Sequence, residues 1–427
     1  MKKIKLTALE RSWILYDIGN SAFILLVSTL IPIYFNDLAT TGGLNESLYL
    51  SYWGYAGSVS TLLVAVIGPI CGTLADHRGF KKPIFMACML LGVLGCAAMG
   101  VTAGWLAFLV VFVLAKVGYS SSLVFYDAML PEVTTDERMN TVSSMGYAYG
   151  YIGSVIPFIL CLLLVQFGDK IGVGAGTAMV VSFLITAVWW FVCTQPLLKR
   201  YRQTAFVEHG GNPVSSTFRR LRDTFREVRQ QKHIFLYLLA FFFFIDGVYT
   251  IIDMATAYGT ALGLDTTGLL LALLLTQFVA FPCSIAFGRF SAKYDTGLLI
   301  KICILCYTGI TLFAVFLVSQ WQFWVLAVLV GMFQGGIQAL SRSYLGKIIP
   351  AERSGEYFGL MDICGKGASF LGTTLIAMVS QLTDGRSFHV FGLELQNENI
   401  AVGTLVVIFA IGFVLFCKAD KLNNTIS

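Results

Sequence analysis

The stretch Gly331–Tyr344, GMFQGGIQALSRSY, decides how the rest of the chain is interpreted, because it places polar side chains inside a long apolar run. Gln334, Gln338 and Arg342 recur every four residues, so on a helix they lie along one face. Such groups are costly in hydrocarbon and persist where they face a bundle interior or a water-filled cavity. We therefore predict a membrane helix whose glutamines either contact a solute or join neighbouring helices, and both interpretations stay open.

The same stretch carries small residues on a second stripe, which predicts close approach of a neighbouring backbone. These residues are Gly335, Gly336, Ala339 and Ser343. Arg342 lies near the end of the helix, where its side chain can reach the membrane interface. A purely structural role at that interface and a role in a cytoplasmic gate are the two interpretations of Arg342.

The composition is that of a polytopic membrane protein. The chain is 57% hydrophobic and only 12% charged, and its mean hydropathy is +0.77, which excludes a soluble domain of this length. The net charge of +5 is not gathered on a soluble domain. We therefore expect the lipid bilayer, and no nucleic acid, as the surroundings of this chain.

Metal, redox and nucleotide chemistry are not expected. Almost all of the ten cysteines fall in apolar runs, and the four histidines lie in loops or at helix ends, so no metal site or imidazole relay is predicted. The string Gly359–Gly367, GLMDICGKG, has five residues between its glycines and ends without the Ser or Thr of a phosphate-binding loop. We predict no cofactor and no enzyme.

Twelve hydrophobic runs are long enough to cross about 30 Å of hydrocarbon, so the predicted fold class is an all-α bundle of about twelve transmembrane helices. The runs are 13–35, 49–74, 83–102, 105–130, 141–165, 174–194, 234–258, 267–290, 298–318, 321–347, 358–383 and 400–417. The first run lacks a cleavage site and is interpreted as an uncleaved span. Of the 29 lysines and arginines, all but Lys116, Lys170, Lys366 and Arg386 fall on one side, which places both termini in the cytoplasm.

The longest interruption divides the spans six and six. We predict a first bundle at 1–194, a cytoplasmic linker at 195–233 and a second bundle at 234–427. In the linker, Phe218, Leu221, Phe225 and Val228 have helical spacing among arginines, which favours an amphipathic helix on the anionic leaflet over a solvated linker.

The two bundles resemble each other at an offset of about 219 residues, as expected of a duplicated transporter. The matching pairs are Trp105 with Trp324, Pro131 with Pro350, Glu137 with Glu356 and Gly153 with Gly372.

Two acids and one base are predicted to lie inside the membrane. Asp246 is about 18 Å along a helix from His233 at 1.5 Å per residue, and Asp253 lies two turns further on the same face. A carboxylate at that depth needs a cation or a bound proton. Proton coupling and solute contact are the functional interpretation, and a static ion pair with Lys116 or Lys366 is the alternative. Lys116 is also a candidate contact for an anionic solute.

Polar residues near the cytoplasmic ends of two spans complete the candidate site. In the first span Asn20 lies deeper than Asp17 and is a candidate solute contact, while Asp17 stabilises the helix start or belongs to the gate. Asp127, near the end of the fourth predicted span, is expected to meet loop cations at the same gate.

The loop after the second span reads Gly72-Thr-Leu-Ala-Asp76-His77-Arg78-Gly79-Phe80-Lys81-Lys82. It resembles the signature G-x-x-x-D-[RK]-x-G-[RK]-[RK] of the major facilitator superfamily, with His77 and Phe80 at two of its basic positions. The resemblance implies the superfamily fold, alternating access and a cytoplasmic gate role for Asp76 and Arg78. A second copy near Gly288 lacks an Asp four residues later.

The segment Tyr16–Phe23, YDIGNSAF, resembles the Y-D-W-A-N-S-A-F signature of the vacuole-effluxer-like family, which is related to the fungal autophagy-associated amino-acid effluxer. The opening stretch and the Glu356-Tyr-Phe-Gly359 segment are similar to further family motifs. Membership implies export of amino acids or related metabolites.

We therefore predict a secondary active transporter, a monomer in a bacterial inner (plasma) membrane, that moves a small polar or charged solute. Two six-helix halves would rock around a site near the midplane, with protons as the hypothetical coupling ion. A membrane receptor or assembly factor that keeps the carrier fold without transporting is the alternative of a different class.

Overall fold

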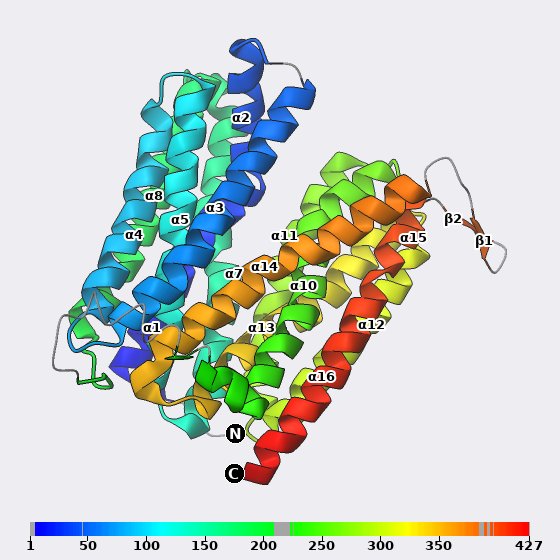
Figure 1. Ribbon diagram of the computed structural model, residues 1–427. Coiled ribbons are helices and arrows are strands. Elements are labelled where there is room, and N and C mark those ends of the chain that lie inside the picture. Colours follow the sequence, from blue (N-terminus) through cyan, green and yellow to red (C-terminus); the bar gives the residue numbers. More distant parts are fainter. Residues whose placement is uncertain are drawn as a thin grey trace. The chain divides into compact units, whose positions relative to one another are not determined.

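Long apolar runs form helices because a membrane-spanning backbone must satisfy its own hydrogen bonds. The computed structural model describes residues 5–44, 46–208, 223–224, 226–383, 388–390, 393–395 and 397–426. Its α-helices are α1 (Ala8–Ser28), α2 (Leu30–Thr41), α3 (Glu46–Ala75), α4 (Lys81–Ala98), α5 (Trp105–Ala128), α6 (Leu130–Val133), α7 (Asp136–Phe167), α8 (Ala175–Arg200), α10 (Lys232–Ala261), α11 (Thr266–Phe290), α12 (Thr296–Val315), α13 (Gln320–Ile348), α14 (Ser354–Leu382), α15 (Asn397–Gly403) and α16 (Leu405–Ile426) (Figure 1).

Short elements connect some of these helices. The 3-10 turns are η1 (Met99–Val101), η2 (Gly168–Ile171) and η3 (Ala351–Arg353). Between α14 and α15, β1 (Phe388–Val390) pairs with β2 (Leu393–Leu395) as an antiparallel hairpin in which Phe388 faces Leu395.

In the described part of the chain, ten helices are long and apolar enough to cross a membrane, and an eleventh span results if α1 and α2 are counted together. In α14 the described apolar portion is shorter, Leu371–Leu382. These helices agree with the predicted architecture of about twelve spans.

The first predicted span, 13–35, is two helices that meet at an angle of 41°. The break lies at Thr29, whose backbone has left the helical region at φ −129° and ψ −74°. Pro32 follows three residues later, and a proline has no N–H to donate to the carbonyl four residues before it, here that of Ser28. The proline therefore accounts for a bend that the hydrophobic run alone did not predict.

Helix starts are fixed by side-chain caps. Thr7 Oγ1 accepts the amide of Glu10 at 3.1 Å, and the Glu10 carboxylate accepts the amide of Thr7 at 2.7 Å, which forms a capping box before α1. Asp265 and Asp295 cap α11 and α12 by accepting the amides of Gly268 and Leu298.

The chain forms two compact units, which are described separately. Unit 1 comprises Met1–Thr135, Tyr149–Phe218 and Ala351–Gly359, and unit 2 comprises Asp136–Ala148, Arg219–Pro350 and Leu360–Ser427. The first turns of α7 thus belong to unit 2, and the first turns of α14 belong to unit 1. The predicted boundaries at 194 and 233 stay a prediction, and the predicted amphipathic helix falls largely on residues 209–222 and 225, outside the described residues.

Helix pairing inside the units follows one scheme twice. In unit 1, α1 packs on α8, α3 and α4 pack on α5, and α4 packs on α8. In unit 2, α10 packs on α16, α11 and α12 pack on α13, and α12 packs on α16. Figure 1 shows α4, α5 and α8 side by side in unit 1, and α12 beside α16 in unit 2. The repeated scheme is what the 219-residue offset in the sequence leads one to expect.

Candidate functional site

The carboxylate of Asp76 binds the start of α14 within unit 1. Its Oδ1 accepts the amide of Gly355 at 2.8 Å and its Oδ2 accepts the amide of Glu356 at 2.9 Å. These amides belong to the first turn of α14, where N–H groups have no partner inside the helix and the helix dipole favours a negative charge. Asp76 is fully buried. We call this pair of hydrogen bonds the α14 contact.

Two glycines let the backbones meet beside this contact. A Cβ atom on Gly72 would lie 2.3 Å from the carbonyl oxygen of Gly355, and a Cβ atom on Gly355 would lie 2.4 Å from that of Gly72. Any side chain at either position would separate α3 from α14. Gly79, at φ +81°, then allows the tight turn into α4.

Lys81 supplies the positive charge that Asp76 needs. Its buried Nζ lies 3.8 Å from Asp76 Oδ1 and 2.6 Å from Glu132 Oε1, and it donates to Ser354 Oγ at 2.8 Å. Burial raises the pKa of Asp76 from 3.8 to about 7, although Lys81 and the two α14 amides favour its ionised form. Lys81 and Glu132 are functional candidates that the sequence reasoning missed; Lys81 occupies one of the basic positions of the signature.

Arg78, predicted as the gate base, is exposed and lies over the ring of Phe206, 5.2 Å from its centroid. Among the ion pairs of the described residues, the cation near Asp76 is Lys81. The gate role of Arg78 stays a prediction.

Asp17 and Asn20 lie in one buried polar network between α1 and α5. Tyr126 donates its hydroxyl to Asp17 Oδ2 at 2.8 Å, and Asn20 Nδ2 donates to the Tyr16 carbonyl at 2.9 Å and to Asp17 Oδ1 at 3.4 Å. The Tyr16 hydroxyl in turn lies 2.6 Å from Ser122 Oγ. The structure therefore brings Asp17 and Asn20 together, with the half-buried Asp127 next to Tyr126 in sequence.

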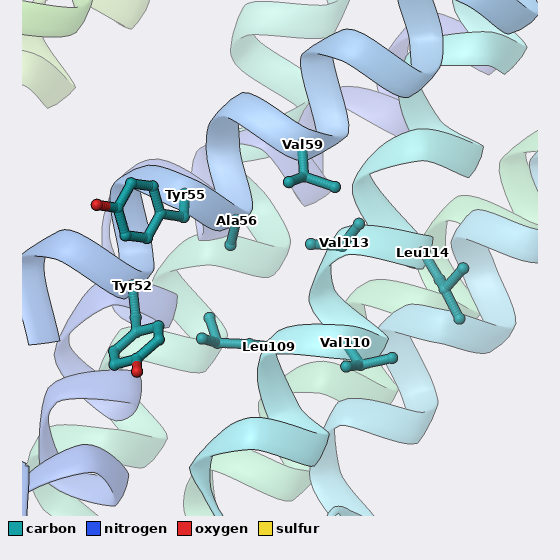
Figure 2. Close-up of a pocket in the computed structure, with 8 residues that line it drawn as sticks. All are labelled: Tyr52, Tyr55, Ala56, Val59, Leu109, Val110, Val113 and Leu114. Carbon is teal, nitrogen blue, oxygen red and sulfur yellow. The ribbon is translucent and has the colours of Figure 1, made fainter.

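Lys116 lies on α5 and faces α3, and an apolar pocket is formed between the same two helices. Its half-buried side chain reaches the ring of Phe112, 5.9 Å from the centroid, and its Nζ is 3.9 Å from where a Cβ on Gly57 would stand. The pocket, toward the N-terminal ends of the two helices, has a volume of about 260 Å³ (Figure 2). Its lining residues are Tyr52, Tyr55, Ala56, Val59, Leu109, Val110, Val113 and Leu114.

Asp246 is fully buried in unit 2, where its Oδ1 accepts the backbone amide of Gly372 at 2.9 Å. Its Oδ2 and the hydroxyl of Thr250, one turn later on α10, have no hydrogen-bond partner among the described residues. Both oxygens converge on Gly372, because a Cβ atom there would lie 2.3 Å from Thr250 Oγ1 and 2.9 Å from Asp246 Oδ2. No cationic side chain of unit 2 that the structure describes forms an ion pair with Asp246; the side chain of Lys366 is outside the described residues.

Asp253 differs from Asp246 in its surroundings. Its side chain is exposed, although it lies only two turns further along α10. Asp246 and Asp253 therefore differ in their exposure to the surroundings and are not expected to have the same role.

The polar stripe of α13 is largely buried. Gln334 is 4% and Arg342 is 3% exposed, and Gln338 is half-buried. Arg342 donates from Nε to Ser143 Oγ and from Nη2 to the Ser143 carbonyl, each at 2.9 Å, and its guanidinium lies 4.4 Å from the ring centroid of Tyr147. Arg342 thus binds the first turns of α7 inside unit 2.

The small-residue stripe of α13 is contacted by neighbouring side chains, whereas the sequence predicted the close approach of a neighbouring backbone. Ser143 Oγ donates to the Ala339 carbonyl at 2.8 Å, Ser343 Oγ donates to Asn140 Oδ1 at 2.7 Å, and a Cβ on Gly336 would lie 2.5 Å from the Phe287 ring.

The start of α7 forms hydrogen bonds with the loop near Gly288, which is the degenerate second copy of the signature loop. Thr141 Oγ1 donates to the Gly288 carbonyl at 3.1 Å, and Asn140 Nδ2 donates to Thr296 Oγ1 at 2.8 Å. Gly288 takes the place of Gly72, and Ala292 stands where an acid corresponding to Asp76 would be. Sequence reasoning missed Asn140, Thr141 and Ser143, whose partners are more than 100 residues away.

Comparison with known proteins gives the family. Residues 8–420 match the family described as "Vacuole effluxer Atg22 like". An MFS-type transporter of Bacillus subtilis (strain 168), YxiO, whose description is "uncharacterized", is 39% identical over 426 residues, which cover 99% of this chain and 97% of that protein. Autophagy-related protein 22-1 of Penicillium rubens is 27% identical over 271 residues, 57% of this chain and 45% of that protein, so the match spans less than half of the fungal relative.

Solved structures give the same fold. The transporter FucP in its outward conformation superposes with a TM-score of 0.71 at 14% identity, covering 96% of this chain and 97% of that one. The human organic anion transporter MFSD10 superposes with a TM-score of 0.66 at 14% identity, covering 96% and 98%. At this identity the likeness concerns the fold alone. With a family match over nearly its whole length and a full-length bacterial relative, the chain belongs to the Atg22-like vacuole effluxer family of major facilitator transporters, which are not enzymes.

Proposed function

We propose that this protein is a proton-coupled secondary carrier that moves an amino acid or a related small polar metabolite by alternating access. Asp246 carries the coupling part of this proposal. It is fully buried on an apolar helix, and one of its oxygens has no partner in the described part of the chain. A charge buried without a cation is costly, so an acid in this position favours an arrangement in which a proton neutralises it.

The proton would bind at Oδ2, because Oδ1 already accepts the Gly372 amide. The Thr250 hydroxyl, which also lacks a partner, stands beside the same glycine and is a suitable acceptor for a carboxylic O–H. When the proton leaves, the amide of Gly372 remains as a donor to the carboxylate, and hydrogen bonds to a charged acceptor are stronger than neutral ones. The protonation state would therefore change how firmly α10 holds α14.

Solute recognition is assigned to the remaining polar residues of the membrane helices. Lys116 would contact a carboxylate or phosphate of the solute, and Asn20, Gln334 and Gln338 would supply hydrogen bonds. Asp253, being exposed, would act as a surface contact for solute or cation rather than as the proton carrier. We place the protein in a bacterial inner membrane with both termini in the cytoplasm, on the distribution of its basic residues.

The first experiment identifies a solute. Thermal unfolding of the purified protein in detergent is measured with each proteinogenic amino acid and with small organic anions, because a ligand that binds only the folded state raises the unfolding temperature. A compound that raises it is then used, radiolabelled, in proteoliposomes with an imposed pH gradient. The failure of every stabilising compound to cross the membrane would instead support the receptor or assembly-factor function.

The second experiment tests Asp246 directly. The Asp246→Asn variant is expected to lose accumulation driven by the pH gradient while keeping solute exchange without a gradient. Infrared difference spectra between acidic and alkaline buffer should show a protonated carboxylic acid band that is missing in Asp246→Asn and shifted in Thr250→Val. Asp253→Asn is the matched control and should keep the band. Gradient-driven accumulation in Asp246→Asn equal to that of the unsubstituted protein would refute the assignment.

A further inference from the structure

The segment Tyr201–Val207 follows α8 without regular secondary structure and lies against the loop between α3 and α4, where Val207 forms an isolated parallel bridge with His77. We call it the strap. Gln203 uses both ends of its side-chain amide: Oε1 accepts the amide of Gly79 at 2.9 Å, and Nε2 donates to the carbonyl of Ala75 at 3.0 Å. Val207 donates its amide to the Asp76 carbonyl at 2.8 Å. The strap thus satisfies backbone groups that the end of α3 and the Gly79 turn leave unpaired.

The strap also surrounds the carboxylate of Glu132. The amides of Thr204 and Ala205 donate to Oε2 at 2.6 and 3.1 Å, and the Tyr201 hydroxyl donates to Oε1 at 2.9 Å. Burial and the neighbouring Glu132 carboxylate raise the pKa of Tyr201, which keeps its hydroxyl a donor. The remaining donor on Oε1 is Lys81, at 2.6 Å.

A continuous path of hydrogen bonds and one ion pair therefore joins the strap to the α14 contact. It runs from the strap to Glu132, from Glu132 to Lys81, and from Lys81 to Ser354 at the start of α14. The second branch runs from Val207 to the backbone of Asp76, whose side chain accepts the Gly355 and Glu356 amides. All of these residues belong to unit 1.

We propose that the strap is a conformational lock: by holding the loop and Glu132 in place it stabilises the α14 contact, so that the linker takes part in opening and closing the transporter. A plain connector would need none of these bonds, since a loop on the surface can pair with water. The strap instead uses seven of its donor and acceptor atoms in hydrogen bonds to the loop between α3 and α4 and to the Glu132 carboxylate. Because Tyr201–Val207 lies within the predicted linker 195–233, a movement of this segment would act on the α14 contact.

Hydrogen–deuterium exchange tests the lock without any solute. The amides of Gly355 and Glu356 are protected by Asp76, so their exchange rate measures how often the α14 contact opens. Gln203→Ala removes the side-chain bonds to the Gly79 and Lys81 amides and to the Ala75 and Ala205 carbonyls. It is expected to accelerate exchange at the Gly355 and Glu356 amides roughly fivefold, the factor for loss of one net hydrogen bond. Gln203→Glu keeps the acceptor and loses the donor, and serves as the milder variant if Gln203→Ala does not fold.

Arg202→Ala is the matched control, because Arg202 is the exposed neighbour of Gln203 in the same segment. It should leave the exchange of both amides unchanged. Faster exchange confined to Gly79 and Lys81, with Gly355 and Glu356 as protected as before, would show that the strap only supports the loop and would overturn the proposal. Equal acceleration in Arg202→Ala would do the same.

Discussion

Replacing Gly72 by alanine tests the close approach of α3 and α14 inside unit 1. The new Cβ would lie 2.3 Å from the carbonyl oxygen and 2.9 Å from the carbonyl carbon of Gly355. Carbon and oxygen atoms in weak contact are about 3.3–3.6 Å apart, so the backbones must separate by about 1 Å. Both neighbours are backbone atoms and no flexible side chain can move aside.

The cost follows from two opposing terms. Overpacking a tight contact destabilises by about 1–3 kcal/mol, whereas alanine stabilises a helix over glycine by about 0.5–1 kcal/mol. Gly54→Ala, in the same helix, is the matched control, because nothing lies within 4 Å of its Cβ position. Gly72→Ala should therefore be less stable than Gly54→Ala by about 1–3 kcal/mol, a factor of about 5–150 in the opening equilibrium.

The assay combines thermal unfolding in detergent with exchange at the Gly355 and Glu356 amides. Gly72→Ala should unfold at a lower temperature and lose protection at both amides, since Asp76 moves away with α3. Gly54→Ala should match or exceed the unsubstituted protein in stability. Equal unfolding temperatures and equal protection for the two variants would refute the close-approach argument.

Three further predictions concern other contacts. The pKa of Asp76 in the folded protein, about 7, lies above its ordinary 3.8, so the stability that the protonated Asp76 contributes is full below pH 3.8 and is lost as pH rises to about 7. The unfolding temperature of the unsubstituted protein relative to that of Asp76→Asn should therefore fall across that window. A constant difference between the two unfolding temperatures would contradict the raised pKa. Gly372→Ala should cost about 1–3 kcal/mol in chemical unfolding through its clash with Thr250, and Thr250→Ala in the same chain should restore part of the loss; no rescue would place the strain elsewhere. Arg342→Lys keeps the charge but loses the paired bonds to Ser143, so thermal unfolding should show a loss of about 1.5–3 kcal/mol, and an unchanged transition would mean that the pair contributes nothing.

The sequence predicted those features that depend on local spacing. Hydrophobic runs gave the helices, because membrane thickness sets their length. The four-residue spacing placed Gln334, Gln338 and Arg342 on one face of a helix, and the structure shows Gln334 and Arg342 buried and Gln338 half-buried. The signature loop pointed to Asp76, whose carboxylate accepts the amides of Gly355 and Glu356 in the first turn of α14.

Contacts between residues far apart in the chain could not be predicted from the sequence. The partner of Arg342 is Ser143, 199 positions away, and that of Asp17 is Tyr126, 109 positions away. Nothing in the local pattern of Glu132 distinguishes it from an acid that caps a loop. Its importance arises from five donors that the fold brings to its carboxylate. Asp246 and Asp253 looked alike in sequence, and only packing separates a buried acid from an exposed one.

Position 292, four residues after Gly288, is alanine and carries no acid, so the starts of α7 and α14 are held by different kinds of contact. The start of α14 meets a carboxylate, whereas the start of α7 is held through Asn140, Thr141 and Ser143, and position 292 is alanine. The two contacts can therefore be altered separately by mutation. Suppressor mutations that restore a protein weakened at Glu132 should gather on the α14 side, and an acid introduced at Ala292 would give the Gly288 loop a charge like that of Asp76 after Gly72.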